Sequence, residues 1–173
     1  KGFLEEAAAA YRAAIAIEPS GLAEAHNNLG NVLKELGRAE EALACYQQAL
    51  ALKPDFAETV FNAAQLLRER GRLAEAAEAF RNLLAVRPDM ADAHYELGNA
   101  LKGMGDAAGA LASYTRALEA NPDYAEARWA AAMSQVPMIA EDDAAAARSR
   151  SASPSRRRCS MVLTLVVFAR GRS

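Results

Sequence analysis

The sequence has few aromatic residues, and before its last dozen positions it is poor in the β-branched residues that sheets require. Aromatic side chains make up 6% of the 173 residues, whereas hydrophobic residues as a whole make up 52%. The excess is alanine, with 43 copies. Alanine has the highest helix propensity and lets helices pack closely. The composition therefore favours an all-α protein and argues against a β-sandwich or a β-barrel.

Cysteine is equally scarce, because the chain has only Cys45 and Cys159. Neither lies in a CxxC motif or in any spacing typical of metal ligands, so the sequence predicts neither a disulfide framework nor a metal site. The first residues are acidic and amphipathic and carry no signal-peptide pattern. We therefore expect a cytoplasmic protein without a cofactor.

Long apolar runs are also lacking, and residues 1–147 carry no excess of basic residues. The one continuous apolar run covers nine residues, 161–169. As a helix it would span roughly 14 Å, about half of the bilayer core, so no membrane partner is predicted. The net charge is −2, but seven arginines and no acid fall in 148–173, which leaves a net of −9 in 1–147. An acidic body argues against nucleic acid as a partner, because phosphate binding needs clustered cations.

The chain does contain an internal repeat. The dipeptide Pro-Asp recurs every 34 residues, beginning at Pro54, Pro88 and Pro122. Alignment on this period gives three full units, at 23–56, 57–90 and 91–124. Residues 1–22 match only the second half of a unit. Residues 125–136 match only the first half, as a partial repeat or a capping helix.

Each unit reads as two helices joined by a turn. In the second unit, Val60, Ala63, Ala64 and Leu67 recur at the spacing of one helical face, and the back half repeats that pattern. The glycines between the halves suit a helix C-terminus that needs a positive φ; they are Gly37, Gly71 and Gly105. Two further columns hold only small residues, which let the two helices approach closely; they are Gly30, Ala64 and Gly98, and Ala42, Ala76 and Ala110.

These units resemble the tetratricopeptide repeat over residues 1 to about 136. The family pattern W-x₂-L-G-x₂-Y…A-x₃-F…P falls in the first full unit on His26, Leu29, Gly30, Leu33, Ala42, Tyr46 and Pro54. The same positions of the later units carry most of the same residue types, although the first and fourth family aromatics are replaced throughout. The resemblance implies a right-handed superhelical solenoid of helix pairs, with a concave groove lined by the first helix of each pair.

A closer resemblance concerns the repeats of O-linked N-acetylglucosamine transferases. The stretch NNLGNVLKELGRAEEALACYQQALALKPDF looks like those repeats. This likeness implies the substrate-recognition arm of a glycosyltransferase that lacks its catalytic domain. The interpretation that we favour is a non-catalytic scaffold that binds proteins or peptides in its concave groove. The transferase arm is one alternative, and an assembly scaffold that self-associates through uncapped repeat ends is the other.

Histidine, cysteine and glycine residues that could act in catalysis or ligand binding have structural interpretations in this sequence. His26 and His94 share one repeat column, usually held by tryptophan, and we expect them to pack between helices. Cys45 has no histidine placed to activate it. No strand precedes Gly103 and Gly105, as a phosphate loop would require. The sequence therefore predicts no catalytic residue and no enzyme.

The first helices show the candidate binding residues, in columns that share one helical face. The first column is Asn27, Phe61 and Tyr95; the second, which we call the amide column, is Asn31, Gln65 and Asn99; the third is the basic column, Lys34, Arg68 and Lys102; and Asn28 and Asn62 lie beside them. Amides carry both a donor and an acceptor, so they suit the backbone of an extended peptide. A solvated helix face is the alternative interpretation.

Two family comparisons bear on this groove. In the transferases, an asparagine ladder binds the peptide backbone; Asn28 and Asn62 match that column, and Glu96 breaks it. Chaperone-binding members hold a carboxylate with lysine and arginine on successive first helices. The positions for those cations fall here on Asn27, Asp92 and Glu96, which argues against that mode.

The repeat pattern ends after Val136, and residues 137–173 form a linker and a basic tail rich in arginine and serine. We expect this tail to be disordered. A translated wrong reading frame and a short apolar anchor are the other interpretations of its composition.

Overall fold

The structure, a computed structural model, describes residues 2–18 and 23–135, and it places only helices and turns there. Seven of the helices are α1 (Gly2–Ile17), α2 (Ala23–Glu35), α3 (Ala39–Leu52), α4 (Ala57–Glu69), α5 (Leu73–Val86), α6 (Ala91–Gly103) and α7 (Ala107–Ala120). An eighth helix covers 125–135. The predicted all-α fold is confirmed. The predictions for the tail at 137–173 lie outside the described residues.

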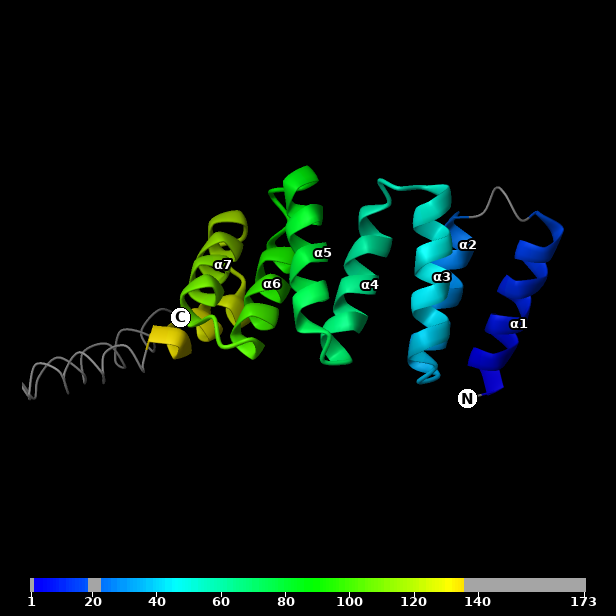
Figure 1. Cartoon of the computed structure of the whole chain (residues 1–173), viewed down its shortest axis with the longest axis horizontal. Helices are drawn as coiled ribbons and strands as arrows, with labels where there is room; N and C mark the ends of the chain where they lie inside the picture. The colour runs from blue at the N-terminus through cyan, green and yellow to red at the C-terminus, as the bar shows by residue number, and fades with distance from the viewer. Residues whose placement is uncertain (1, 19–22, 136–173) are drawn as a thin grey trace, which may run out of the picture. The chain divides into compact units, whose positions relative to one another are not determined.

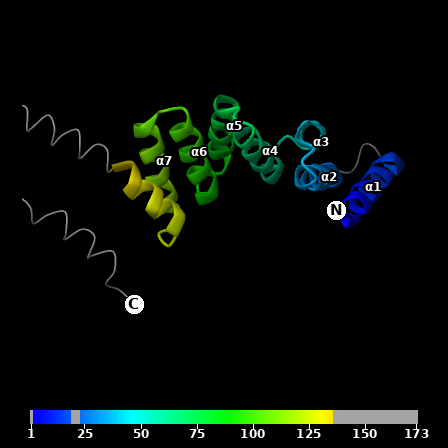
Figure 2. The same ribbon diagram turned by 90° about the horizontal axis from the view of Figure 1, so that it is seen from below.

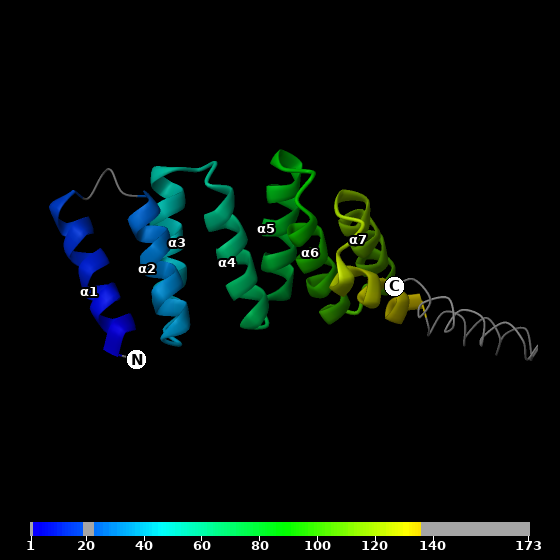
Figure 3. The ribbon, with the colours of Figure 1, turned by 180° about the vertical axis from the view of Figure 1, so that it is seen from behind.

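Helices that follow one another in sequence pack against one another. α2 packs on α3, α4 on α5 and α6 on α7, and the second helix of each pair contacts the first helix of the next. Figures 1 and 3 show this order from opposite sides, and Figure 2 shows α2 beside α3. The first helices α2, α4 and α6 also touch one another directly. No helix in the described ranges is long and apolar enough to cross a membrane.

The turn within each pair has the same construction three times. Gly37, Gly71 and Gly105 have φ angles of 78°, 78° and 84°, the region that favours glycine. In the first turn, the Gly37 amide donates to the Lys34 carbonyl at 2.9 Å, and the next amide donates to the Leu33 carbonyl at 2.8 Å. Such paired bonds cap the last carbonyls of a helix. The prediction of glycine caps between the two helices is therefore confirmed.

A buried aromatic ring fixes the two helices of each pair at close approach. Tyr46 and Tyr114 are fully buried. A β-carbon added to Gly30 would lie 2.5 Å from the Tyr46 ring, and one added to Gly98 would lie 2.5 Å from the Tyr114 ring. The glycine in the first helix therefore makes room for the tyrosine of the second, as the small-residue column predicts.

Helix α1 is held by a small apolar contact and a charged network. Ala8 is buried, and Tyr11 and Ile15 pack beside it against the core of the first full pair. Phe3 at the start of the helix is 88% exposed. Tyr11 and Ile15 are only partly exposed, because they pack against the first full pair.

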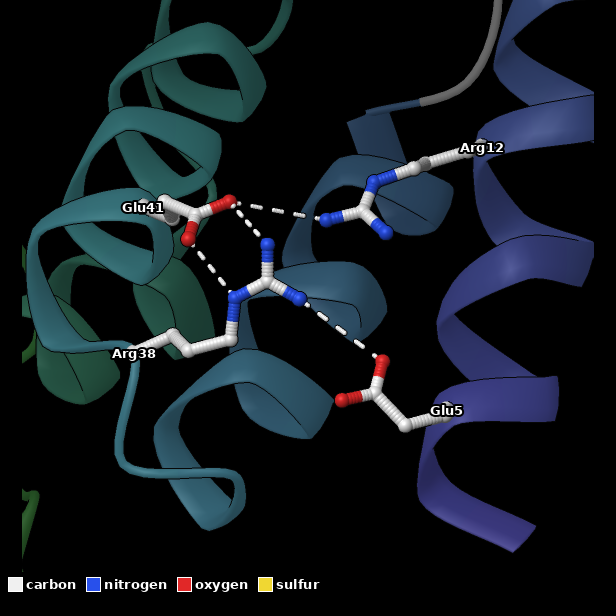
Figure 4. A network of polar contacts seen from close by, with 4 residues as sticks. All are labelled: Glu5, Arg12, Arg38 and Glu41. Carbon is white, nitrogen blue, oxygen red and sulfur yellow. Dashed lines mark hydrogen bonds and ion pairs between the residues drawn. The ribbon is translucent and has the colours of Figure 1, made fainter. Parts of the chain in front are cut away.

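The charged network joins α1 to the turn that precedes α3 (Figure 4). The Arg38 guanidinium donates to both carboxylate oxygens of Glu41 at 2.6 Å. Arg38 also lies 3.7 Å from Glu5, and Glu41 lies 3.5 Å from Arg12. All four side chains reach solvent, so screening keeps their contribution small. The Arg38 hydrogen bond lowers the pKa of Glu41 from its ordinary value.

Candidate peptide-binding face of the first helices

The first helices place the predicted columns at different depths. Asn27 is buried, whereas Lys102 is exposed. The other candidate residues are partly exposed; they are Asn28, Asn31, Lys34, Phe61, Asn62, Gln65, Arg68, Tyr95 and Asn99. The columns therefore share a face, but they do not offer every side chain to a ligand.

Asn27 is a link between two helices. Its side chain is 1% exposed. Its amide nitrogen donates to Glu58 Oε1 at 3.0 Å, and its oxygen accepts from the Thr59 hydroxyl at 3.0 Å and from Asn62 Nδ2 at 3.2 Å. All these partners lie on α4. The hydrogen-bonding capacity of Asn27 is thus used to join α2 to α4, which leaves its side chain out of reach of a ligand.

The amide column is oriented from behind by tyrosine hydroxyls in two repeats. The Tyr46 hydroxyl donates to Asn31 Oδ1 at 2.7 Å, and the Tyr114 hydroxyl donates to Asn99 Oδ1 at 2.9 Å. In the middle repeat, Phe80 replaces the tyrosine and Gln65 replaces the asparagine. Burial raises the pKa of Tyr46 above its ordinary range and that of Tyr114 to about 12, so both hydroxyls keep their protons at neutral pH.

The basic column is largely paired with acids of the same face. Lys34 Nζ lies 3.2 Å from Glu69 Oε1 and donates to Gln65 at 2.6 Å. Arg68 Nε lies 2.7 Å from Glu96 Oε2, as an ion pair rather than an aligned hydrogen bond. Lys102 has no acidic partner among the described residues. The sequence predicts three equivalent cations along the groove, but two of the three are neutralised by neighbouring carboxylates.

Aromatic side chains occupy the part of the face nearer α6. The Phe61 ring meets the Phe80 ring edge-on, with centroids 5.7 Å apart. The Tyr95 ring lies 5.8 Å from Tyr114 and 5.2 Å from Tyr124. Burial and a hydrogen bond with Asp92 raise the pKa of Tyr124 above its ordinary range. The sequence analysis did not include Tyr124, although it immediately precedes the last half-repeat and so lies at a repeat junction.

The other residues considered for chemistry fall at packing positions. His94 is buried, with Nε2 3.0 Å from the Pro88 carbonyl oxygen. Cys45 is half-buried, and burial raises the pKa of its thiol. Gly103 is the last residue of α6, and Gly105 lies in the turn that follows it. Within 2–18 and 23–135, no group of histidine, cysteine and acidic residues is placed to hold a metal ion.

A hollow lies between the second helices α5 and α7. Its volume is about 910 Å³. His94, Leu97 and Leu101 of α6 line it, with Arg81 and Arg116 from the flanking helices. The sequence analysis did not predict this hollow, because the repeat pattern shows which helix faces are apolar but not where neighbouring second helices leave a gap.

Antiparallel helix pairs stacked in sequence order, with a glycine-capped turn in each pair, define an α-solenoid repeat protein. A family profile described as Tetratricopeptide repeat matches 23–56 and 91–124. A second profile, described as TPR repeat, matches 1–37 and 64–105. The repeats of this chain are therefore tetratricopeptide repeats.

Solved structures agree with this assignment of the fold. MamA shares 21% sequence identity and a TM-score of 0.75, with 84% of each chain covered. A tetratricopeptide repeat protein from Parabacteroides merdae shares 28% identity and a TM-score of 0.73, over 78% of this chain and 54% of that one. The first repeat domain of Spaghetti (RPAP3), bound to the HSP90 peptide SRMEEVD, shares 22% identity and a TM-score of 0.66, over 69% and 95%.

No curated protein matches the chain. The finer resemblance to the repeats of O-linked N-acetylglucosamine transferases stays a prediction. These solved structures are 21–28% identical in sequence to this chain, and their likeness supports the solenoid architecture alone. The choice of ligand has to be argued from the residues on the face of the first helices.

Proposed function

We propose that the face formed by α2, α4 and α6 binds an extended segment of a protein partner, and that the chain is a non-catalytic scaffold. The observation that carries this proposal is the amide column. Asn31, Gln65 and Asn99 occupy the same position on the first helices of three successive repeats, and all three are partly exposed. An extended chain repeats its backbone polar groups at a regular spacing, so a regular row of amides can bind it without reading its sequence.

Two neighbouring features add to the affinity for such a segment. Lys102 offers a cation at the α6 end of the row, and Phe61 and Tyr95 offer partly exposed aromatic surface beside it. Aromatic side chains contribute contact area at binding surfaces with little loss of conformational entropy. The peptide held by the RPAP3 repeat domain supports the proposal, because that domain has the same fold.

The first experiment tests whether the amide column is the binding surface. A library of random 12-residue peptides is selected on the wild-type chain, and one selected peptide is labelled with fluorescein for anisotropy measurements. The triple variant Asn31→Ala, Gln65→Ala and Asn99→Ala removes the column. We expect its affinity to fall by at least about tenfold, since each amide contact contributes on the order of 1 kcal/mol.

The control separates binding from folding. Asn31→Ala and Asn99→Ala also remove the acceptors of the buried Tyr46 and Tyr114 hydroxyls, so we expect a lower melting temperature. Binding is therefore measured well below the melting transition, where circular dichroism shows full helicity. A double variant at two exposed amides of α3, Gln47→Ala and Gln48→Ala, should bind like the wild type. If the triple variant binds the peptide as tightly as the wild type, the partner uses another surface.

A further inference from the structure

The amide oxygens of the two outer members of the column each already accept a hydrogen bond from a buried tyrosine. Asn31 Oδ1 accepts from the Tyr46 hydroxyl at 2.7 Å and from Asn62 Nδ2 at 3.1 Å. Asn99 Oδ1 accepts from the Tyr114 hydroxyl at 2.9 Å. Both tyrosines are fully buried, so these bonds lie on the protein side of the amide. The amide nitrogen, on the other branch of the same planar group, points away from that side.

The oxygen of Gln65, the middle member of the column, also accepts a hydrogen bond from the protein, but from a different donor. Phe80 has no hydroxyl, so Gln65 cannot be held as its neighbours are. Instead, Gln65 Oε1 accepts from Lys34 Nζ at 2.6 Å. Lys34 is itself held by Glu69 at 3.2 Å. The Gln65 oxygen thus accepts from Lys34. The lysine is in turn restrained by its attachment to α2 and by its ion pair with Glu69 on α4.

A carboxylate fixes the direction of the bonds around Asn31. Glu58 can only accept, so Asn27 must present its NH₂ group to Glu58 and its oxygen to Asn62. Asn62 must therefore present its NH₂ group to Asn27, and it presents the same group to Asn31. Asn31 consequently directs its oxygen inward, where Tyr46 also donates. The direction of each amide follows from the one before it, and the chain of bonds begins at Glu58.

The three amide nitrogens remain available to a ligand. Among the described residues, Asn31 Nδ2 and Gln65 Nε2 have no hydrogen-bond partner, and neither atom is buried. Asn99 Nδ2 makes one long contact, 3.5 Å to Glu96 Oε2, which leaves its second hydrogen free. Asn31 Oδ1 accepts two hydrogen bonds from the protein, and Gln65 Oε1 and Asn99 Oδ1 each accept one, so the column turns its oxygens toward protein donors and leaves its N–H groups for a ligand.

We propose that the amide column is a donor-only track, which binds the carbonyl and carboxylate oxygens along one edge of an extended peptide. Tyr46, Tyr114 and Glu58 act as positioning residues for this track. The inference rests on the proposed function and narrows it, because a free amide would contact both the N–H and C=O groups of a peptide, whereas these amides contact only its acceptors. The cation of Lys102 at the α6 end suits an acidic side chain of the same peptide.

Isosteric substitutions test the direction of the bonds. Asn31→Asp with Asn99→Asp keeps an oxygen for each tyrosine hydroxyl and replaces each outward NH₂ by an acceptor. We expect the affinity for the selected 12-residue peptide to fall by at least about tenfold. At each position the N–H donor is lost, and an aspartate oxygen then faces an oxygen of the peptide. Gln47→Glu with Gln48→Glu adds the same two charges at exposed positions of α3 and should change the affinity less than about threefold.

The outcomes separate this inference from the proposed function. If the triple alanine variant loses the peptide and the double aspartate variant keeps it, the face binds the peptide but the donor-only assignment is wrong. If both variants keep the peptide, the proposed function fails. If the triple alanine and the double aspartate variants both lose the peptide while the α3 charge control keeps it, the result supports the proposed function and the donor-only assignment.

A double-mutant cycle tests the positioning role of Tyr46. Tyr46→Phe removes one of the two hydrogen bonds that hold the Asn31 oxygen while keeping the buried ring, so we expect a weakening of a few-fold in peptide binding. In an Asn31→Ala background the same change should cause no further loss, because no amide remains to be oriented. A purely structural role of Tyr46 would weaken binding equally in both backgrounds, and that result would overturn the assignment.

Discussion

At the scale of single residues, Asn27 shows how a repeat column can mislead. Its column continues through Phe61 and Tyr95, and the spacing alone places all three on the binding face. The sequence does contain a signal of its true role. In the column Ala25, Thr59 and Ala93, only the middle repeat carries a hydroxyl, and Thr59 is fully buried against Asn27. A lone polar residue in an otherwise apolar column indicates a hydrogen bond between repeats rather than a ligand contact.

This interpretation of Asn27 predicts a loss of stability. Asn27→Ala leaves the Thr59 hydroxyl and one donor of Asn62 without their partner between α2 and α4. We expect the free energy of unfolding in urea to fall by about 1–3 kcal/mol. Asn28→Ala is the matched control on the same helix, since Asn28 is partly exposed, and it should change the free energy by less than about 0.5 kcal/mol. Equal effects of the two substitutions would contradict a structural role for Asn27.

The buried tyrosines predict a dependence of stability on alkaline pH. Burial raises the pKa of Tyr46 above its ordinary value of 10.0 and that of Tyr114 to about 12. The folded state therefore keeps these protons at a pH where the unfolded chain loses them. The stabilisation is fully present below about pH 10 and is lost as the pH rises through the folded pKa values. We expect the urea midpoint to fall between about pH 10 and pH 12, and to fall less steeply in Tyr46→Phe; parallel curves would speak against this cause.

At the scale of helices, the pattern of the sequence is sufficient to place the elements. The 34-residue period, the three turn glycines and the prolines two residues beyond α3, α5 and α7 define each helix pair. These features are local, so sequence spacing determines them. The contacts across the face are not local. Tyr46 reaches Asn31 from the second helix of its own pair, and the pairing becomes visible in the sequence only when Gly30, Asn31 and Tyr46 are compared with Ala64, Gln65 and Phe80.

The docking of α1 predicts a local effect of one arginine. Arg38→Ala removes the contacts with Glu41 and with Glu5 on α1. Arg72 is a matched control one repeat later, because it makes the same bidentate pair with Glu75 within its own helix start. We expect faster amide hydrogen exchange in α1 for Arg38→Ala and unchanged exchange for Arg72→Ala. The effect should be less than about 1 kcal/mol and should shrink in high salt, as for exposed ion pairs. If amide hydrogen exchange in α1 is identical in the two variants, the Arg38 contacts do not hold α1, and its docking depends on the apolar contacts of Ala8, Tyr11 and Ile15.

At the scale of the whole array, the buried side chains form two separate clusters. The smaller one joins α1, α2 and α3, and it includes Leu66 of α4. The larger one joins α4 to α7 with Ala130 and Ala131 of the last helix. Between the clusters, α2 meets α4 through the hydrogen bonds of Asn27 and of Lys34. The junction between the first two full pairs therefore combines these polar bonds with the apolar contacts of Ala63, Leu66 and Leu67 of α4. Solenoids derive their cooperativity from such interfaces between neighbouring repeats.

The division of the core into two clusters predicts that the array does not unfold as one unit. Native-state hydrogen exchange should show the amides of α1 to α3 opening together at a lower free energy than those of α4 to α7, because their cluster buries fewer side chains. Thr59→Val keeps the shape of the side chain but removes its bond to Asn27, so it should weaken the coupling across the junction. We expect this variant to lower the opening free energy of α1 to α3 while that of α6 and α7 stays unchanged. A single opening free energy for all helices, lowered equally by Thr59→Val, would mean that the two clusters unfold together and that the polar bonds between α2 and α4 transmit the full cooperativity of the array.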